Sequence, residues 1–184
     1  NQCVCDAPNA CANCYRWWDA IAIESVANRG IYLGDTQHAD AARTLLAHSP
    51  YSDVWAGKCP FMDDFAWYLL AYTRVFEWLR EPAFLHAAER LHKWLMRKGH
   101  DRQCGGVTWR ACGPADGCGC DKNSVTLLEL LIGSARLALL RPAVTHYLAT
   151  ANDLWSWFHS YRPFDDDGLV YDGLTPTDPG VVTG

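Results

Sequence analysis

Apolar residues recur at helical spacing along most of this chain, and this pattern limits its fold more than any other feature. In segment 63–80 the apolar side chains lie three or four residues apart, the spacing of one face of an α-helix. They are Trp67, Leu70, Ala71, Val75 and Trp78. Comparable stripes predict further helices over residues 15–28, 36–48, 84–98, 127–138 and 148–158. We therefore expect an all-α protein.

The predicted helices are joined in pairs, and two of the pairs resemble each other. Gly30 is expected to end the first helix, whereas Pro82 and Pro142 mark tight turns inside Leu-Arg-(Glu)-Pro-Ala motifs. Four positions after the first turn recur 63 residues later, Leu148 matching Leu85. The matched residues are Leu85, Ala88, Leu91 and Trp94 with Leu148, Ala151, Leu154 and Trp157. A repeated hairpin is typical of stacked or ring-like α-hairpin folds, and chance alignment of two amphipathic helices is the alternative.

The composition is that of one globular domain, which we place over residues 1–184. Hydrophobic residues make up 49% of the chain, too many for a disordered protein. The net charge of −5 and the lack of a Lys/Arg cluster argue against nucleic acid or an anionic membrane as a partner. Charged or polar residues interrupt every apolar run, so no membrane span is expected.

The nine cysteines are concentrated in two places and predict disulfides. They gather in an N-terminal segment, 1–14, and in a Gly- and Cys-rich loop, 99–121, while Cys59 stands apart. Disulfides indicate a secreted, extracellular protein, and a start at Asn1 without Met is typical of a processed mature form. Because the count is odd, one thiol is free or pairs elsewhere. Cys11 and Cys14 have the spacing of half a zinc site, but no second suitable pair follows, so we expect no metal and no cofactor.

Two consecutive aspartates, Asp63 and Asp64, stand where a loop gives way to the aromatic-rich helix. Glycoside hydrolysis needs two carboxyl groups, one acting as acid and the other as nucleophile or base. Aspartate is also favoured at helix caps and in first turns for structural reasons alone. Neighbouring side chains in a regular helix point about 100° apart. The pair would therefore converge on one sugar most easily with Asp63 at the cap position.

Four motifs resemble glycoside hydrolase family 76, the α-1,6-mannanases. They occur in the family's order over about residues 55–175 and correspond to roughly the N-terminal half of its catalytic domain. The motifs are Asp63-Asp64-Phe65-Ala66-Trp67 with Leu70-Ala71-Tyr72, Cys104-Gly105-Gly106-Val107-Thr108-Trp109, Lys122-Asn123-Ser124, and Gly168-Leu169-Val170-Tyr171-Asp172-Gly173. The resemblance implies the helical hairpins of an (α/α)6 toroid, about half of which is present in this chain.

The resemblance also implies retaining cleavage of α-1,6-mannosidic linkages in mannan or cell-wall glycans. Asp63 would be the nucleophile and Asp64 the general acid/base, and the carboxyl groups of a retaining pair lie about 5–5.5 Å apart. A helix N-terminus favours the ionised form of one carboxyl group, while apolar neighbours raise the pKa of the other.

Six further residues are candidates for sugar binding, and each has a structural alternative. They are Trp67, Gly105, Gly106, Trp109, Asn123 and Asp172. The tryptophans either stack on sugar faces or fill the core, and the glycines let the backbone approach a ligand closely. Asn123 either binds sugar hydroxyls or caps a helix, and Asp172 either binds hydroxyls or forms an Asp-Gly turn.

The length of the chain leaves the function open between an enzyme and a binding module. A toroid of six hairpins needs more than about 300 residues at this repeat length, so the chain is a fragment, a half completed by another chain, or a shortened relative. We expect a secreted glycoside hydrolase or transglycosylase. A non-catalytic extracellular glycan-binding or structural module on the same scaffold is the main alternative, and a zinc-stapled interaction domain is another.

Overall fold

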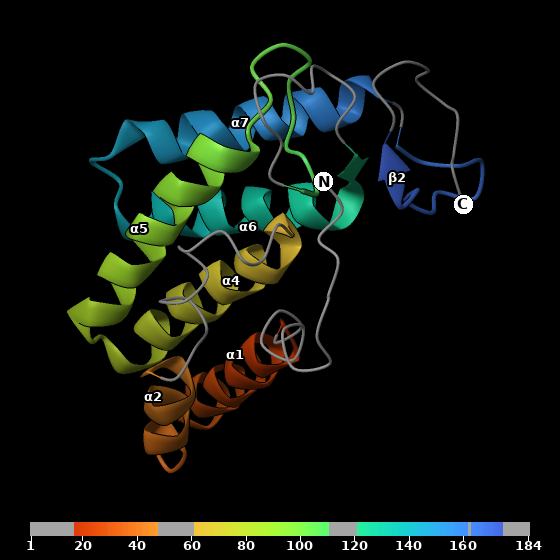
Figure 1. Cartoon of the computed structure of the whole chain (residues 1–184). Helices are drawn as coiled ribbons and strands as arrows, with labels where there is room; N and C mark the ends of the chain where they lie inside the picture. Colours follow the sequence, from red (N-terminus) through yellow and green to blue (C-terminus); the bar gives the residue numbers. More distant parts are fainter. Residues whose placement is uncertain (1–16, 48–60, 111–120, 162, 175–184) are drawn as a thin grey trace, which may run out of the picture.

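The computed structural model describes residues 17–47, 61–110, 121–161 and 163–174, and within them the fold is α-helical (Figure 1). The helices are α1 (Trp17–Leu33), α2 (Ala39–Ala47), α4 (Met62–Leu79), α5 (Pro82–Gly99), α6 (Ser124–Leu140) and α7 (Thr145–Ser160). β1 (Lys122–Asn123) and β2 (Gly173–Leu174) form a short antiparallel ladder. The all-α prediction is confirmed. The cysteine-rich segment 1–14, Cys59 and residues 111–120 of the predicted loop lie outside the described residues, so the disulfide framework stays a prediction.

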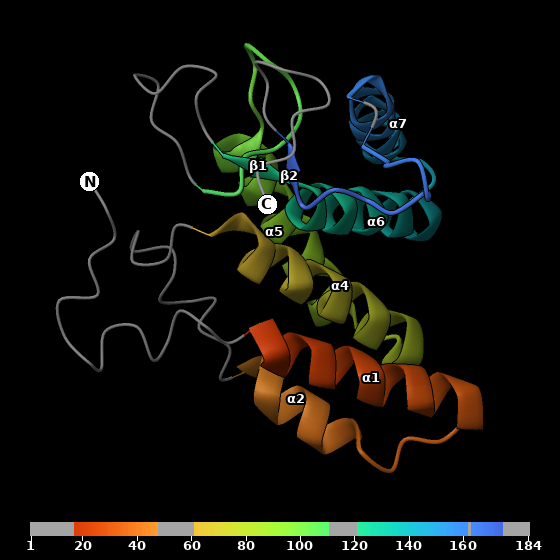
Figure 2. The ribbon, with the colours of Figure 1, turned by 90° about the vertical axis from the view of Figure 1, so that its right-hand side faces the viewer.

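Of the described helices, three form one layer and the other three cover it. α1, α4 and α6 lie side by side and begin at the same end of the molecule (Figure 2). α2 packs against α1, α5 against α4 and α7 against α6. Each helix of the first layer is thus followed along the chain by its partner in the second. The described part of the chain consists of three successive helical hairpins, and the first turns of α1, α4 and α6 face a common end.

The turn between α4 and α5 forms where the sequence predicts it. Arg80 adopts a left-handed backbone conformation with φ 58°, and its N–H donates to the carbonyl oxygen of Phe76 at 2.9 Å. Pro82 follows at the first position of α5, where a missing N–H costs no helical hydrogen bond. Arg141 ends α6 with a similar hydrogen bond but a different backbone conformation, with φ −132°, and its N–H donates to the carbonyl oxygen of Leu137 at 2.8 Å.

The prediction that Gly30 ends the first helix is wrong. α1 continues to Leu33, and Gly34 follows with a φ of 67°. Gly30 lies against the indole of Trp78 on α4, so close that a Cβ atom at this position would be 2.1 Å from the ring. The Nε1 atom of Trp78 also donates to the carbonyl oxygen of Asp35 at 2.7 Å. The glycine therefore permits close packing of α1 on α4 rather than helix termination.

The hydrophobic core fills the space between the two layers. Its fully buried members include Ile23 on α1, Leu69 on α4, Leu91 and Leu95 on α5, and Leu130 and Leu137 on α6. At Gly133 α6 approaches α4 so closely that a Cβ atom would lie 2.4 Å from Leu69 Cδ2. Among the described helices, none has the length and apolar character needed to cross a membrane.

α6 and α7 leave large apolar side chains exposed along their outer surface. On α6 these residues recur every seventh position, which places them on one face of the helix. The exposed residues are Val125, Ile132 and Leu139 on α6 with Leu148 and Trp155 on α7. Their alignment indicates a surface that further helices can cover.

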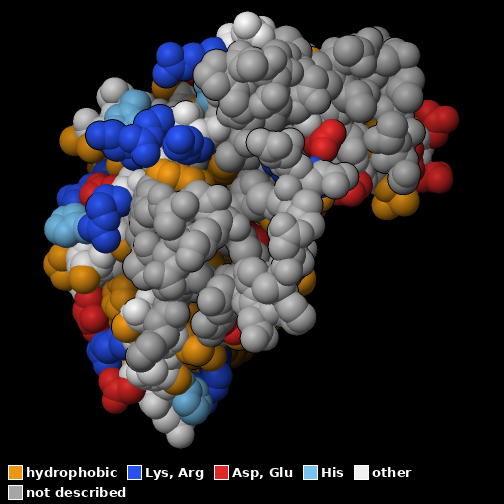
Figure 3. Space-filling view, viewed as in Figure 1, with side chains coloured by type: hydrophobic (Ala, Val, Ile, Leu, Met, Phe, Trp, Pro, Cys, Tyr) orange, Lys and Arg blue, Asp and Glu red, His pale blue; other side chains and the backbone are white. Residues whose placement is uncertain are grey.

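In the view of Figure 3, basic side chains gather in one area and acidic side chains in another, while single acidic and basic side chains are mixed over the rest of this face. The basic area lies on the α5 side of the molecule, where Arg90, Lys93, Arg97 and Lys98 are exposed. The acidic side chains at the opposite edge lie near β2, where Asp166 and Asp167 are exposed. Neither area includes the aspartate pair of α4.

Candidate active site

The aspartate pair lies in the first turn of α4, but neither residue caps the helix. α4 begins at Met62, and its cap is Phe61, whose extended backbone makes no side-chain cap hydrogen bond. An isolated bridge between Phe61 and Arg110 holds this residue, and the Met62 N–H donates to the carbonyl oxygen of Trp109 at 2.7 Å. Asp63 is therefore not the cap residue, because pairing with the loop before β1 places the cap two residues earlier, at Phe61.

The carboxylate of Asp63 accepts two hydrogen bonds. Its Oδ1 atom accepts from the backbone N–H of Asp64 at 3.0 Å, and its Oδ2 atom accepts from Trp109 Nε1 at 2.9 Å. Burial raises the pKa of Asp63, the two donors act in the opposite direction, and the charge of Asp172 adds to the rise. The donors stabilise the ionised form, which is the form that a nucleophile requires.

Asp64 has a contrasting environment. Its Oδ2 atom is buried and has no hydrogen-bond partner among the described residues. Burial, followed by the negative charge of Asp63, raises the pKa of Asp64 to about 7. A carboxyl group with this pKa keeps its proton in weakly acidic solution. The two adjacent residues differ in their donors, because two N–H groups act to lower the pKa of Asp63 and no such donor in the described part of the chain acts on Asp64. This contrast is the one expected between a nucleophile and a general acid.

A third carboxyl group, Glu129 on α6, lies near the pair, and the sequence analysis did not identify it. The residue is 4% exposed, and within the described part of the chain neither of its carboxyl oxygens has a hydrogen-bond partner. Burial comes first among the causes that raise its pKa to about 10, followed by the charges of Asp63, Asp64 and Glu24. The available signal was a single acidic residue in the largely apolar helix 124–140.

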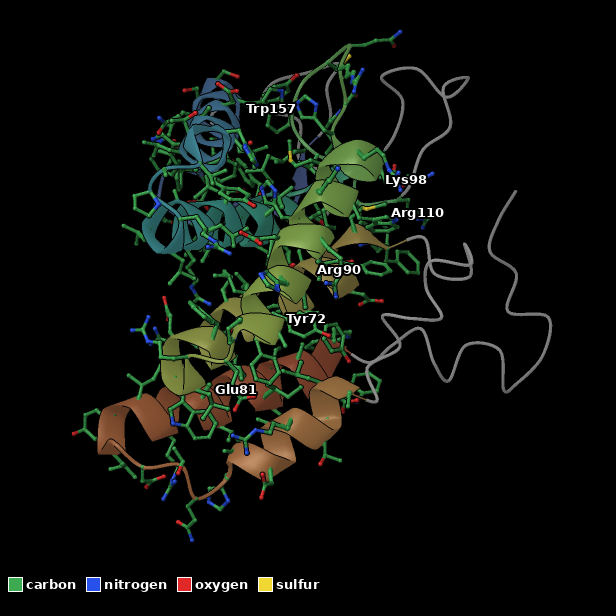
Figure 4. The ribbon with its side chains drawn as sticks, turned by 90° about the vertical axis from the view of Figure 1, so that its left-hand side faces the viewer. Tyr72, Glu81, Arg90, Lys98, Arg110 and Trp157 are labelled. Carbon is green, nitrogen blue, oxygen red and sulfur yellow. The ribbon has the colours of Figure 1, made fainter. Side chains whose placement is uncertain are left out.

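Trp109 links the loop after α5 to the aspartate pair. Besides its hydrogen bond to Asp63, its ring lies 4.9 Å from the Phe61 ring, and the Arg110 guanidinium stands 4.7 Å from its centroid. Figure 4 shows Arg110 beside the first turn of α4. Trp109 therefore orients a carboxylate, and its predicted stacking on a sugar stays a prediction.

Gly105 and Gly106 bring the same loop close to α7. Both have positive φ angles, 71° and 70°, and a Cβ atom on either would lie 2.5 or 2.8 Å from the indole of Trp157. Trp157 Nε1 donates to the carbonyl oxygen of Cys104 at 2.8 Å, and Figure 4 shows this residue on α7. The close approach that these glycines allow is thus to Trp157. Their contact with a sugar stays a prediction.

A buried ion pair fastens this loop to β1. Lys122 Nζ lies 2.7 Å from Asp101 Oδ2, and the side chains are 0% and 8% exposed. Asp101 Oδ1 also accepts the backbone N–H groups of Gln103 and Cys104. Burial acts to raise the pKa of Asp101, but the hydrogen bonds from Lys122 and the two N–H groups lower it overall.

The remaining candidates occupy different places around α4 and α6. Asn123 caps α6, its side-chain oxygen accepting the N–H of Thr126 at 2.9 Å, which matches the structural alternative for this residue. The exposed Asp172 lies next to Asn123, because the backbone carbonyl oxygen of Asp172 accepts the N–H of Ser124 at 2.8 Å. Trp67 is half-buried, with its ring 6.4 Å from that of Trp17. The predicted sugar contacts of these residues stay predictions.

The arrangement is a set of carboxyl groups with one indole donor. α4 supplies the nucleophile candidate Asp63 and the acid candidate Asp64, and the adjacent helix α6 supplies the buried Glu129. Among the described residues no group of three or more His, Cys, Asp or Glu side chains is placed to hold a metal ion. The chemistry available to these groups is proton transfer and carboxylate attack.

The fold is similar to those of solved glycoside hydrolases. The α-1,6-mannanase of a Salegentibacter species is 20% identical with a TM-score of 0.72, over 90% of this chain and 48% of its own. An inactive variant of that enzyme with two consecutive aspartates replaced by asparagine, solved with α-1,6-mannotriose, is 19% identical with a TM-score of 0.74, over 92% and 49%. A protein of Listeria innocua is 22% identical with a TM-score of 0.73, over 91% and 47%.

These comparisons define both the fold and its extent. The chain spans about half the length of the structures it matches, which confirms the prediction of helical hairpins amounting to about half of an (α/α)6 toroid. No curated protein matches the chain significantly. The family model of glycosyl hydrolase family 76 matches residues 2–182. Because this match covers nearly the whole sequence, the chain belongs to glycosyl hydrolase family 76.

Proposed function

We propose that this chain provides the catalytic carboxyl groups of a secreted, retaining glycoside hydrolase that cleaves α-1,6-mannosidic linkages. The observation that carries the proposal is the unequal environment of two adjacent carboxyl groups. Asp63 accepts hydrogen bonds from two N–H donors, whereas Asp64 has a buried, unpartnered oxygen and a pKa of about 7. The linkage is suggested by the similar Salegentibacter enzyme, an α-1,6-mannanase.

The proposed reaction has two steps. Protonated Asp64 gives its proton to the glycosidic oxygen while the Asp63 carboxylate attacks the anomeric carbon. The C–O bond breaks, and a glycosyl ester forms on Asp63. Asp64, now ionised, accepts a proton from a water molecule that attacks the same carbon and releases the sugar. Two displacements retain the anomeric configuration.

The direct contribution of the protein is to orient the Asp63 carboxylate and to offset, through two donors, part of the rise in its pKa that burial causes. Trp109 Nε1 holds Oδ2, and the Asp64 N–H holds Oδ1. The first turn of a helix also carries a partial positive charge that favours a carboxylate. The leaving carboxylate of the second step regains the same two donors, so both steps use one preorganised environment.

Hydrolysis of α-1,6-mannan by the wild type and by single variants tests the proposal. We expect Asp63→Asn and Asp64→Asn each to lower kcat/KM by at least about 100-fold, the range of an essential acid or base. Asp153→Asn, an exposed residue on α7, is the matched control and should not alter the rate. ¹H NMR of the first product should show retained configuration. Inversion would exclude Asp63 as a nucleophile, and tight binding of α-1,6-mannotriose without turnover would favour a glycan-binding module.

The whole cleft requires more helices than the described hairpins supply. We propose that further hairpins, from the same or another chain, cover the exposed apolar residues of α6 and α7, among them Ile132 and Leu139. Chains of these 184 residues should then associate through this surface. Light scattering should give a smaller mass for Ile132→Lys with Leu139→Lys than for the wild type. An equal monomeric mass for both proteins would contradict this proposal.

Secretion and disulfides are part of the same proposal, supported by the nine cysteines. Thiol titration of denatured, unreduced protein should find one free thiol in each chain. Nine free thiols with stoichiometric zinc would instead support the zinc-stapled alternative.

A further inference from the structure

Glu129 is a buried carboxyl group that the mechanism above leaves without a role. Its two oxygens, Thr126 Oγ1 and Asp64 Oδ2 are buried side-chain atoms without a hydrogen-bond partner in the described part of the chain. A buried unpartnered polar atom is costly, so such atoms rarely persist without a function. These atoms lie on the first turn of α4 and the first two turns of α6, and α4 packs against α6, which connects Glu129 to the catalytic pair.

The neighbours of Glu129 on α6 show which way it faces. Gly133, one turn later, contacts Leu69 of α4. Arg136, two turns later, donates to the carbonyl oxygen of Leu70 at 3.2 Å and pairs with Glu24 of α1 at 2.7 Å. Positions 129, 133 and 136 share one face of the helix. Glu129 therefore faces α4 and α1, the helices that carry the acidic residues acting on it.

The charged groups around Glu129 are mostly carboxylates. Asp63 and Asp64 act on it from α4 and Glu24 from α1, while the cation of Arg136 is paired with Glu24. Burial and these negative charges raise the pKa of Glu129 to about 10. The group therefore keeps its proton when Asp63 and Asp64 are ionised, and a protonated carboxyl group has one O–H donor.

We propose that Glu129 is a positioning residue whose O–H donates a hydrogen bond to the Asp64 carboxylate after Asp64 has protonated the leaving oxygen. The inference rests on the proposed function, because it takes Asp64 as the acid/base. Glu129 retains its proton throughout, so no bond to hydrogen is broken on this residue. The hydrogen bond stabilises ionised Asp64 until that residue accepts a proton from water, and it uses the Asp64 Oδ2 atom that otherwise lacks a donor.

The titration of Asp64 in Glu129→Gln and Glu129→Leu tests this role. Gln keeps a neutral donor of similar shape, whereas Leu keeps only the volume. ¹³C NMR of labelled aspartate carboxyls, assigned with Asp64→Asn, gives the pKa directly. We expect Gln to leave the Asp64 pKa within about half a unit and Leu to raise it by about one unit, because only Leu removes a donor to the ionised form.

The opposite results would overturn the inference. A lower Asp64 pKa in both variants would show that Glu129 is ionised, since removing a like charge lowers the pKa. An unchanged pKa in both would show that no hydrogen bond forms. The labelled Glu129 carboxyl of the wild type provides a second test that needs no folded Leu variant, because its signal should stay protonated at pH 8. Ionisation of this group below pH 7 would also reject the proposal.

These titrations separate the inference from the proposed function, because neither requires turnover. If the protein gives the expected pKa values but does not hydrolyse mannan, the proposed activity is rejected and the hydrogen bond from Glu129 to Asp64 is not. An active enzyme with the contrary titrations would reject the role of Glu129 alone.

Discussion

Replacing Trp109 by Phe removes one of the two donors that hold the Asp63 carboxylate and leaves an aromatic ring in place. The lost hydrogen bond joins Trp109 Nε1 to Asp63 Oδ2 at 2.9 Å. A hydrogen bond to a charged group contributes about 1.5–3 kcal/mol, which corresponds to about 1–2 pKa units. Asp63 is only partly buried, so water replaces some of the lost interaction. We therefore expect the pKa of Asp63 to rise by about one unit.

Two assays report this change. ¹³C NMR titration of labelled aspartate gives the pKa of Asp63, and the acid limb of the kcat/KM profile should move upward by the same amount because the nucleophile must be ionised. Trp155→Phe, which changes an exposed tryptophan on α7, is the matched control and should move neither. An unchanged or lower pKa of Asp63 in Trp109→Phe would refute the reasoning that the indole stabilises its charge.

Three further predictions follow from the described contacts. Activity should fall as the pH rises through about 7, because Asp64 then loses the proton that it gives to the leaving oxygen. The pKa of Asp64 in the folded protein also exceeds the ordinary value of 3.8. Protonated Asp64 therefore contributes to the stability of the fold below about pH 4, and this contribution is lost as the pH rises to about 7. Urea unfolding should show this slope reduced in Asp64→Asn, and an unchanged slope would contradict it. Lys122→Met should lower the free energy of unfolding by about 3–5 kcal/mol in the same assay, because it leaves the Asp101 carboxylate buried without its cation. The double variant with Asp101→Asn should recover part of this loss. If the effects of the two substitutions simply add, the two side chains do not interact. Gly106→Ala should lower the melting temperature through its φ of 70° and the Trp157 contact, whereas Gly168→Ala should show only the cost of its φ of 81°, since nothing lies within 4 Å.

Local patterns predicted the helices, and contacts between distant segments explain the errors. The stripes of 63–80 and 84–98 and the turn at Pro82 are local features, and the structure has α4, α5 and their turn close to the expected positions. The prediction that Gly30 ends a helix is wrong because the residue that packs against Gly30, Trp78, belongs to another helix and could not be identified from the local sequence.

In the candidate site, too, local sequence predicted some features, while contacts between distant segments determined the others. The Asp63-Asp64 motif was visible in the sequence, but its helix starts at Met62 because the loop residue Trp109 accepts the Met62 N–H. Glu129 could not be connected to the pair from sequence, since its approach depends on how α6 packs on α4. Asn123 had two readings, and its hydrogen bond to the Thr126 N–H identifies the cap.

In the proposed reaction the two adjacent carboxyl groups have different roles, and Asp63 forms the covalent bond to the sugar. Mass spectrometry can locate this bond in peptides from enzyme that has been incubated with a slowly hydrolysed fluorinated mannosyl donor. We expect one mannosyl group on Asp63 and none in Asp63→Asn. Labelling of Asp64 instead, or rapid turnover of mannan by Asp63→Asn, would contradict these roles.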